Sequence, residues 1–186
     1  WTPIAPGTVV ASNHDITGID WDPIRKRYVA FLSRYDTETE GPYKGLRIPQ
    51  QSVSDDLIHW KQPWPIVTPD PSAAIEKGET QFYGMSAMLS RGPLLVSLVK
   101  VLRDDLNCEP DKTAAELHDT RPYAGLGYSV LAWSHDGEHW QRDTEPFLDR
   151  NAQPGTWDRA MAWADDQMIL GDYTYIYYGG YRWGHK

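Results

Sequence analysis

Three carboxylates stand at matching places in a pattern that repeats along the 186-residue chain. Asp15, Glu79 and Asp158 each lie at or next to the start of a segment rich in apolar and aromatic residues. A pair of carboxyl groups can cleave a glycosidic bond, because one protonates the leaving oxygen while the other activates water or attacks the sugar. If the three segments converge in space, these acids are the candidate catalytic residues.

The residues near these acids in the sequence have polar and aromatic side chains of the kinds that bind sugars. His14 and Arg159 can bind hydroxyl groups, and Gln81, Tyr83 and Trp163 would form polar and aromatic walls. The chain has nine Trp and eleven Tyr but only three Phe, and rings with a polar tip suit a wet sugar site. The structural alternatives are a turn cap for each Asp and a core position for each ring. A channel lined by carboxylates would also suit a cation or water.

A repeated phrase indicates how these segments are arranged. SVSDDLIHW at 52–60 and AWSHDGEHW at 132–140 share Ser, any residue, Asp, two residues and His-Trp. Ser and Asp side chains accept backbone N–H groups in tight turns, and a Trp ring packs well between sheets. We therefore interpret the phrase as a structural turn rather than as a duplicated ligand site. The residues concerned are Ser54, Asp56, His59, Trp60, Ser134, Asp136, His139 and Trp140.

Short strands surround each phrase, in the same order both times. Strand-like segments lie at 14–22, 27–35, 45–54, 80–88, 93–102, 125–134, 157–165 and 173–181, and one helical turn is expected at 111–119. The phrase would turn each third strand into a short fourth.

Four-stranded antiparallel units in series predict an all-β fold, a β-propeller in one partial domain spanning 1–186. Blade one covers about 14–68, blade two about 79–149, and a third begins at about 157–186. The first strand of each blade would line the central channel, which brings Asp15, Glu79 and Asp158 to one axial pocket. Because only about two and a half blades are present, we expect either self-association or further blades from elsewhere.

Composition excludes several classes of function. The net charge of −8 and the pI near 5.1 argue against a nucleic-acid partner, and no apolar run approaches the roughly 20 residues that span a membrane. The single Cys108 forms no internal disulfide and no cysteine metal site. Phosphate-loop, nucleophile-elbow and His-Glu-x-x-His motifs are missing from the sequence. We predict no cofactor and no metal, and we favour an extracellular or periplasmic location over the cytoplasm.

Several stretches together resemble the five-bladed β-propeller glycoside hydrolase superfamily of β-fructosidases and arabinanases, especially its uncharacterised bacterial family 32-like members. They are HDITGIDWDPIRKRYVAFLSRY, ETQFYGMSAM, GTWDRAMAWA and IYYGGYRWGHK, together with the two turns. The resemblance implies a glycoside hydrolase acting on a carbohydrate, with Asp15 as base or nucleophile and Glu79 or Asp158 as acid. The alternatives are a non-catalytic carbohydrate-binding or scaffold propeller, and a glycoside phosphorylase that would use Arg159 and Arg182 for phosphate.

Overall fold

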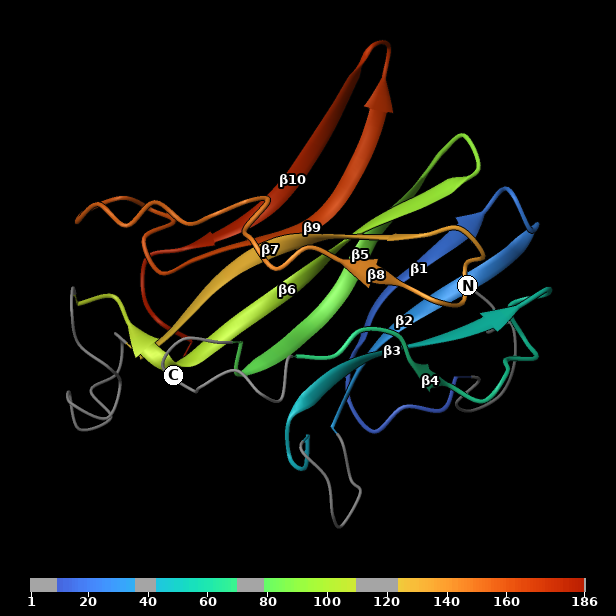
Figure 1. The fold of residues 1–186 in the computed structure, drawn as a ribbon, viewed down its shortest axis with the longest axis horizontal. Helices are drawn as coiled ribbons and strands as arrows, with labels where there is room; N and C mark the ends of the chain where they lie inside the picture. The colour runs from blue at the N-terminus through green and yellow to red at the C-terminus, as the bar shows by residue number, and fades with distance from the viewer. Residues whose placement is uncertain (1–9, 36–42, 70–78, 110–123, 186) are drawn as a thin grey trace, which may run out of the picture.

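The computed structural model describes residues 10–35, 43–69, 79–109 and 124–185, and these are arranged entirely as strands, turns and loops. Figure 1 shows that strands close in sequence lie side by side, so that the colours change gradually from one group of strands to the next. The all-β fold predicted from the sequence is confirmed. The strands are β1 (Ile16–Asp22), β2 (Arg27–Tyr35), β3 (Arg47–Ser54), β4 (Trp64–Pro65), β5 (Gln81–Arg91), β6 (Leu94–Asn107), β7 (Ala124–Ser134), β8 (Gln141–Arg142), β9 (Met161–Leu170) and β10 (Tyr173–Tyr181).

Two four-stranded antiparallel meanders and one hairpin make up the structure. Sheet 1 has the order β1-β2-β3-β4, sheet 2 runs from β5 through β6 and β7 to the short β8, and β9 pairs with β10. A single parallel bridge, from Gly127 to Met161, joins the hairpin to β7. The expected helical turn at 111–119 lies outside the described residues. In the described part of the chain, no helix has the length and hydropathy that crossing a membrane requires.

The first repeated phrase forms the turn between β3 and β4. The Ser54 hydroxyl accepts the backbone N–H groups of Asp56 and Leu57, and Asp56 Oδ1 accepts those of Ile58 and His59, both at 2.8 Å. The backbone and side-chain hydrogen bonds from His59 and the backbone bond from Ile58 hold the pKa of Asp56 well below its usual range.

The second phrase repeats this geometry between β7 and β8. Asp136 Oδ1 accepts the N–H groups of Glu138 at 2.8 Å and His139 at 2.7 Å, and Ser134 accepts that of Gly137 at 2.8 Å. Gly137 has φ 69°, close to the φ 67° of Leu57 in the first turn. The left-handed conformation therefore belongs to the turn itself, and glycine adopts it without strain while leucine does not. The interpretation of both phrases as structural turns is confirmed.

An apolar layer packed around Phe31 and Trp140 lies between sheets 1 and 2. Their ring centroids are 5.8 Å apart in an edge-on arrangement. Gln51 is fully buried beside them, and its side-chain amide donates to the carbonyl of Gly137 at 2.6 Å while accepting from Trp140 Nε1 at 2.8 Å. The Trp of the second turn thus packs against the preceding sheet, as the phrase predicts.

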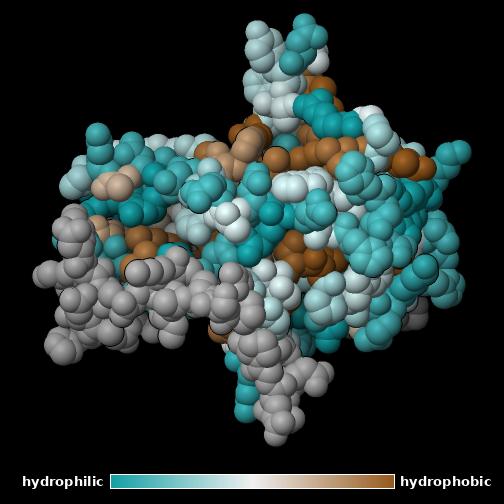
Figure 2. Space-filling model, viewed as in Figure 1, coloured by the Kyte–Doolittle hydropathy of each residue, from teal (hydrophilic) through white to brown (hydrophobic). Residues whose placement is uncertain are grey.

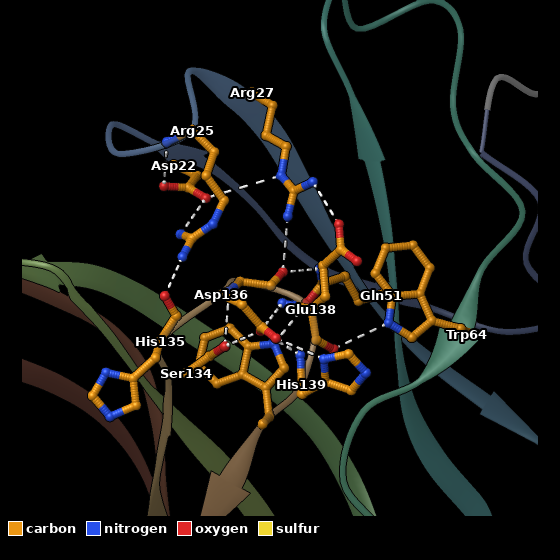
Figure 3. Close-up of polar contacts among 12 residues, drawn as sticks. Asp22, Arg25, Arg27, Gln51, Trp64, Ser134, His135, Asp136, Glu138 and His139 are labelled. Carbon is orange, nitrogen blue, oxygen red and sulfur yellow. Dashed lines mark hydrogen bonds and ion pairs between the residues drawn. The ribbon is translucent and has the colours of Figure 1, made fainter.

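A polar cluster clamps the β1–β2 hairpin onto the second turn (Figure 3). The buried carboxylate of Asp22 accepts the backbone N–H groups of Ile24 and Arg25 and the Arg25 guanidinium at 3.0 Å. Arg25 also donates to the carbonyl of His135. Arg27 donates to the carbonyl of Gly137 at 3.1 Å and to Glu138 at 3.0 Å.

The first strands of the three units lie side by side. The Thr17 hydroxyl on β1 donates to the carbonyl of Met85 on β5 at 2.6 Å, and the Ser86 hydroxyl donates to the carbonyl of Ala164 on β9 at 3.3 Å. A Cβ on Gly84 would stand only 2.7 Å from Thr17 Cγ2, so the close approach of β1 to β5 requires glycine there. β1 therefore packs beside β5, and β5 packs beside β9.

Candidate functional site

A cavity of about 330 Å³ opens where sheet 2 meets the β9–β10 hairpin. Its lining comes from four strands and the segment that follows β10. The lining residues are Tyr83 on β5, Lys100 on β6, Met161 and Trp163 on β9, Tyr181 on β10, and Gly184 and His185. Two of them, Tyr83 and Trp163, are predicted substrate-binding residues.

Stacked aromatic rings form one wall of the cavity. Tyr83 and Trp163 lie 4.7 Å apart between ring centroids at an interplanar angle of 22°, and the His185 ring meets Tyr83 edge-on at 4.9 Å. Trp163 is fixed because its Nε1 donates to the carbonyl of Val101 at 3.0 Å. The guanidinium of Arg47, from sheet 1, lies 4.0 Å from the Tyr83 ring centroid. These contacts hold the wall rigid.

Polar groups gather on another side of the cavity. The Lys100 ammonium is paired with the carboxylate of Asp165. Asp165 Oδ2 and the Tyr181 hydroxyl each lie 3.4 Å from the point where a Cβ of Gly179 would stand, so glycine leaves room for both. The cavity therefore offers the hydrogen-bond donors of Lys100 and Tyr181 beside aromatic rings, a combination suited to a ligand with apolar faces and hydroxyl groups.

Asp15 and His14 form a pair just before β1. Asp15 Oδ2 lies 2.9 Å from His14 Nδ1, and its side chain is 65% exposed. The His14 ring meets Tyr35 edge-on at 4.9 Å between centroids. Asp15 is thus accessible to a ligand.

Glu79 is engaged in a buried ion pair. Both of its carboxylate oxygens accept from the Arg142 guanidinium on β8 at 2.7 Å, and its side chain is 8% exposed. A bidentate guanidinium favours the charged carboxylate, whereas a general acid must carry a proton in order to donate it. This pairing disfavours the acid role predicted for Glu79 and indicates a structural one.

Asp158 and Arg159 precede β9, which begins at Met161 rather than at 157 as expected. Asp158 is buried, with the Tyr178 hydroxyl donating to its carboxylate at 3.5 Å. Loss of hydration, and then the negative charge of Asp158, raise the pKa of Tyr178, so the phenol keeps its proton. Arg159 donates to the carbonyl of Cys108 at 3.0 Å, so this cation is engaged by the protein itself.

The predicted site residues are only partly brought together. Gln81 donates to Asp104 and accepts from the backbone of Arg47, outside the residues that line the cavity. The three predicted catalytic acids have separate partners, which are His14 for Asp15, Arg142 for Glu79 and Tyr178 for Asp158.

Five residues line the cavity without having been predicted from the sequence, and the described residues form no metal centre. Within them, no three His, Cys, Asp or Glu side chains are grouped to hold a metal ion. The cavity residues that sequence reasoning missed are Lys100, Met161, Tyr181, Gly184 and His185.

A further acid that the sequence did not single out lies on β1. Asp20 receives a hydrogen bond from the backbone of Met88 on β5 and is influenced by the charge of Asp166 on β9. Its Oδ2 atom is buried and accepts no hydrogen bond from the described residues. Burial first, and then the repulsion from Asp166, raise the pKa of Asp20 to about 6.

Asp20 should make folding stability depend on pH. Because its pKa is raised in the folded state, its contribution is complete below about pH 4 and is lost as pH rises through 6. We expect the wild type to lose on the order of 2 kcal/mol more than Asp20→Asn between pH 4 and pH 7. Urea unfolding at several pH values measures this difference. The exposed Asp143→Asn is the control, and equal pH slopes for Asp20→Asn and the wild type would contradict the assignment.

Comparison with known proteins gives a likeness in fold. No family model matches the chain, and no curated protein matches it. An N-acetylgalactosamine deacetylase from F. plautii, solved in complex with blood group B trisaccharide, is similar over 95% of this chain at 16% identity and a TM-score of 0.54. A protein solved as an RGII complex is similar over 87% at 13% identity and a TM-score of 0.47. This chain spans 45% and 40% of those two proteins, and the first likeness concerns the fold alone.

Proposed function

We propose that the chain is part of a β-propeller, with two complete four-stranded blades and the first two strands of a third. The repeated strand order, the two matching turns and the side-by-side packing of β1, β5 and β9 support this arrangement. Each Ser-x-Asp-x-x-His-Trp turn then closes the outer end of a blade. The cavity lies between blade two and the start of blade three, on the side of the first strands β5 and β9.

We further propose that this cavity binds a carbohydrate. The observation that carries the proposal is the combination of the stacked Tyr83 and Trp163 rings with Lys100, the partner of Asp165, in one cavity. A sugar presents apolar C–H faces to aromatic rings and hydroxyl groups to donors and acceptors at its rim. The cavity volume of about 330 Å³ falls within the range of small-ligand sites. The trisaccharide bound to the deacetylase of similar fold is consistent with the same ligand class.

Binding measurements on cavity variants test this proposal. A panel of immobilised glycans identifies a ligand, and calorimetry then compares the wild type with Lys100→Met and Tyr181→Ala. Losing a charged hydrogen bond to a hydroxyl costs about 1.5–3 kcal/mol, so Lys100→Met should bind roughly tenfold or more weakly. Tyr175→Ala, an exposed tyrosine of β10 that does not line the cavity, is the matched control. If both cavity variants bind as tightly as the wild type, the cavity is not the sugar site.

We also propose glycosidic bond cleavage, with Asp15 as base or nucleophile and Asp158 as acid, two residues that do not themselves line the cavity. Asp158 is favoured over Glu79 because only the Tyr178 hydroxyl contacts its carboxylate, at 3.5 Å, whereas Arg142 binds both oxygens of Glu79 at 2.7 Å. Release of reducing ends from the bound glycan should fall in Asp15→Asn and Asp158→Asn while sugar affinity is retained. Binding without release in the wild type would instead identify a non-catalytic carbohydrate-binding propeller.

A further inference from the structure

Lys100 and Arg47 bring positive charge to the cavity between sheet 2 and the β9–β10 hairpin. The Lys100 ammonium lines the cavity, although its side chain is only 12% exposed. Arg47 lies behind the aromatic wall, with its guanidinium 4.0 Å from the Tyr83 ring centroid. A cation that is largely removed from water requires acceptors or negative charge nearby. Asp165 supplies one partner for Lys100, but an ammonium group carries three N–H donors, so Lys100 can bind a second anionic group.

Arg47 carries a charge that no carboxylate of the described residues balances by direct contact. Its Nε and Nη2 atoms donate to the Tyr35 hydroxyl at 3.2 Å and 3.1 Å, and the charged groups or rings that influence it belong to Tyr35 and Tyr83. Its Nη1 atom is buried and has no hydrogen-bond partner among the described residues. Leaving a buried donor unpaired costs stability. An anionic ligand in the adjacent cavity would supply the counter-charge that Arg47 lacks.

The charge at the cavity differs in sign from that of the chain as a whole. The chain has 26 Asp and Glu against 18 Lys and Arg, and Figure 2 shows hydrophilic side chains over most of the coloured surface in view. The described lining residues nevertheless include Lys100 and no Asp or Glu. Asp165, the partner of Lys100, is 56% exposed, so water screens its charge more than that of the lysine. With Arg47 behind the wall, the cavity therefore has a positive potential.

We propose that the cavity selects acidic sugars, whose negatively charged group binds Lys100 while the sugar ring packs on the wall formed by Tyr83 and Trp163. This inference rests on the proposed carbohydrate-binding function and names its ligand class. Lysine presents a point charge that suits a carboxylate and a sulfate alike, so the shared feature is the negative charge. Arg47 is a specificity-determining residue that acts through its charge, because it does not itself line the cavity.

Matched sets of glycans test this preference. Each neutral hexose glycan of the immobilised panel is placed beside the derivatives in which its hydroxymethyl group is oxidised to a carboxylate or sulfated. At low salt one or both charged members should bind roughly tenfold more tightly than the neutral member, and comparing the two shows which acidic group is preferred. If the neutral members bind as tightly as the charged ones, the cavity binds carbohydrate but this inference is wrong. If no glycan binds, the proposed carbohydrate-binding function itself is wrong.

Variants of Arg47 separate its charge from its packing, measured as the ratio of the neutral to the charged dissociation constant. Arg47→Gln should lower this ratio roughly threefold, whereas Arg47→Lys keeps the charge and should keep the ratio even if both affinities fall. Arg34→Gln is the matched control. Arg34 precedes Tyr35, the cross-strand partner of Arg47, so its side chain points to the other face of sheet 1. An unchanged ratio in Arg47→Gln, or an equal fall in Arg34→Gln, would overturn the role of Arg47.

Discussion

Replacing Trp140 with alanine is expected to lower the free energy of unfolding by about 3–5 kcal/mol. The Trp140 ring is 8% exposed and lies in the core cluster between sheets 1 and 2, against Phe31. Alanine would leave a cavity between the two sheets. It would also remove the N–H group that donates to the side-chain oxygen of Gln51, and that buried acceptor would lose its partner.

The corresponding residue of the first turn provides the control for this prediction. Trp60 is only partly buried and packs against a smaller cluster of Val10, Ala30 and Leu32. Because fewer apolar atoms surround it, Trp60→Ala should cost less than Trp140→Ala. Urea unfolding followed by circular dichroism measures both, since the signal does not depend on the tryptophan that is removed. A loss below about 1 kcal/mol for Trp140→Ala would contradict a role in joining the sheets.

Replacing Asp22 with alanine is the second change for which we expect a large loss, about 3–5 kcal/mol. Asp22 has no exposed surface, and its carboxylate receives two backbone N–H groups and the Arg25 guanidinium. Removing it leaves these donors unpaired. It also leaves the cations of Arg25 and Arg27, which hold the hairpin on the second turn, without their buried counter-charge.

Two further variants separate charge from hydrogen bonding at this clamp. Asp22→Asn keeps an oxygen that can accept the backbone N–H groups, so it should recover part of the stability lost in Asp22→Ala. Glu138→Gln changes a half-exposed partner of Arg27, and exposed pairs contribute about 0–1 kcal/mol. Thermal unfolding of the three variants under one set of conditions ranks them. If Asp22→Ala and Glu138→Gln lose equal stability, the prediction that the buried carboxylate of Asp22 contributes more than the half-exposed one of Glu138 is wrong.

The strands were predictable from sequence because their signals are local. Alternating apolar residues located β2 and β10 at their observed bounds, and the Ser-x-Asp-x-x-His-Trp phrase located both turns between third and fourth strands. β9 begins at Met161, four residues later than the sequence pattern predicts. Asn151 and Thr156 form hydrogen bonds that keep the segment before Met161 in turns, and the apolar pattern does not reveal such bonds.

The site was less predictable because partners lie far apart in the chain. Glu79 matched the pattern of a channel acid, yet its partner Arg142 comes from the short strand β8, and no spacing rule connects them. The ring types of Tyr83 and Trp163 predict walls of a sugar site, and the structure does place the two rings together. Lys100 interrupts an apolar strand in the sequence, and only the pairing of β6 with its neighbours shows that it faces the cavity.

The meander order of the two complete sheets has a consequence for how the chain folds. Every strand in a meander pairs with its immediate neighbour in sequence, so loop closure within a sheet costs little entropy. Contacts between the two sheets join residues far apart in sequence and therefore cost more loop-closure entropy. They are made by Trp140, by Gln51 and by the polar cluster around Asp22. We therefore expect sheet 1 to form first as the chain is synthesised. Its unfolding should become fully cooperative only after the turn at Asp136, which contacts sheet 1, has been synthesised. Each new sheet would then fold by packing its apolar face against the sheet that formed before it.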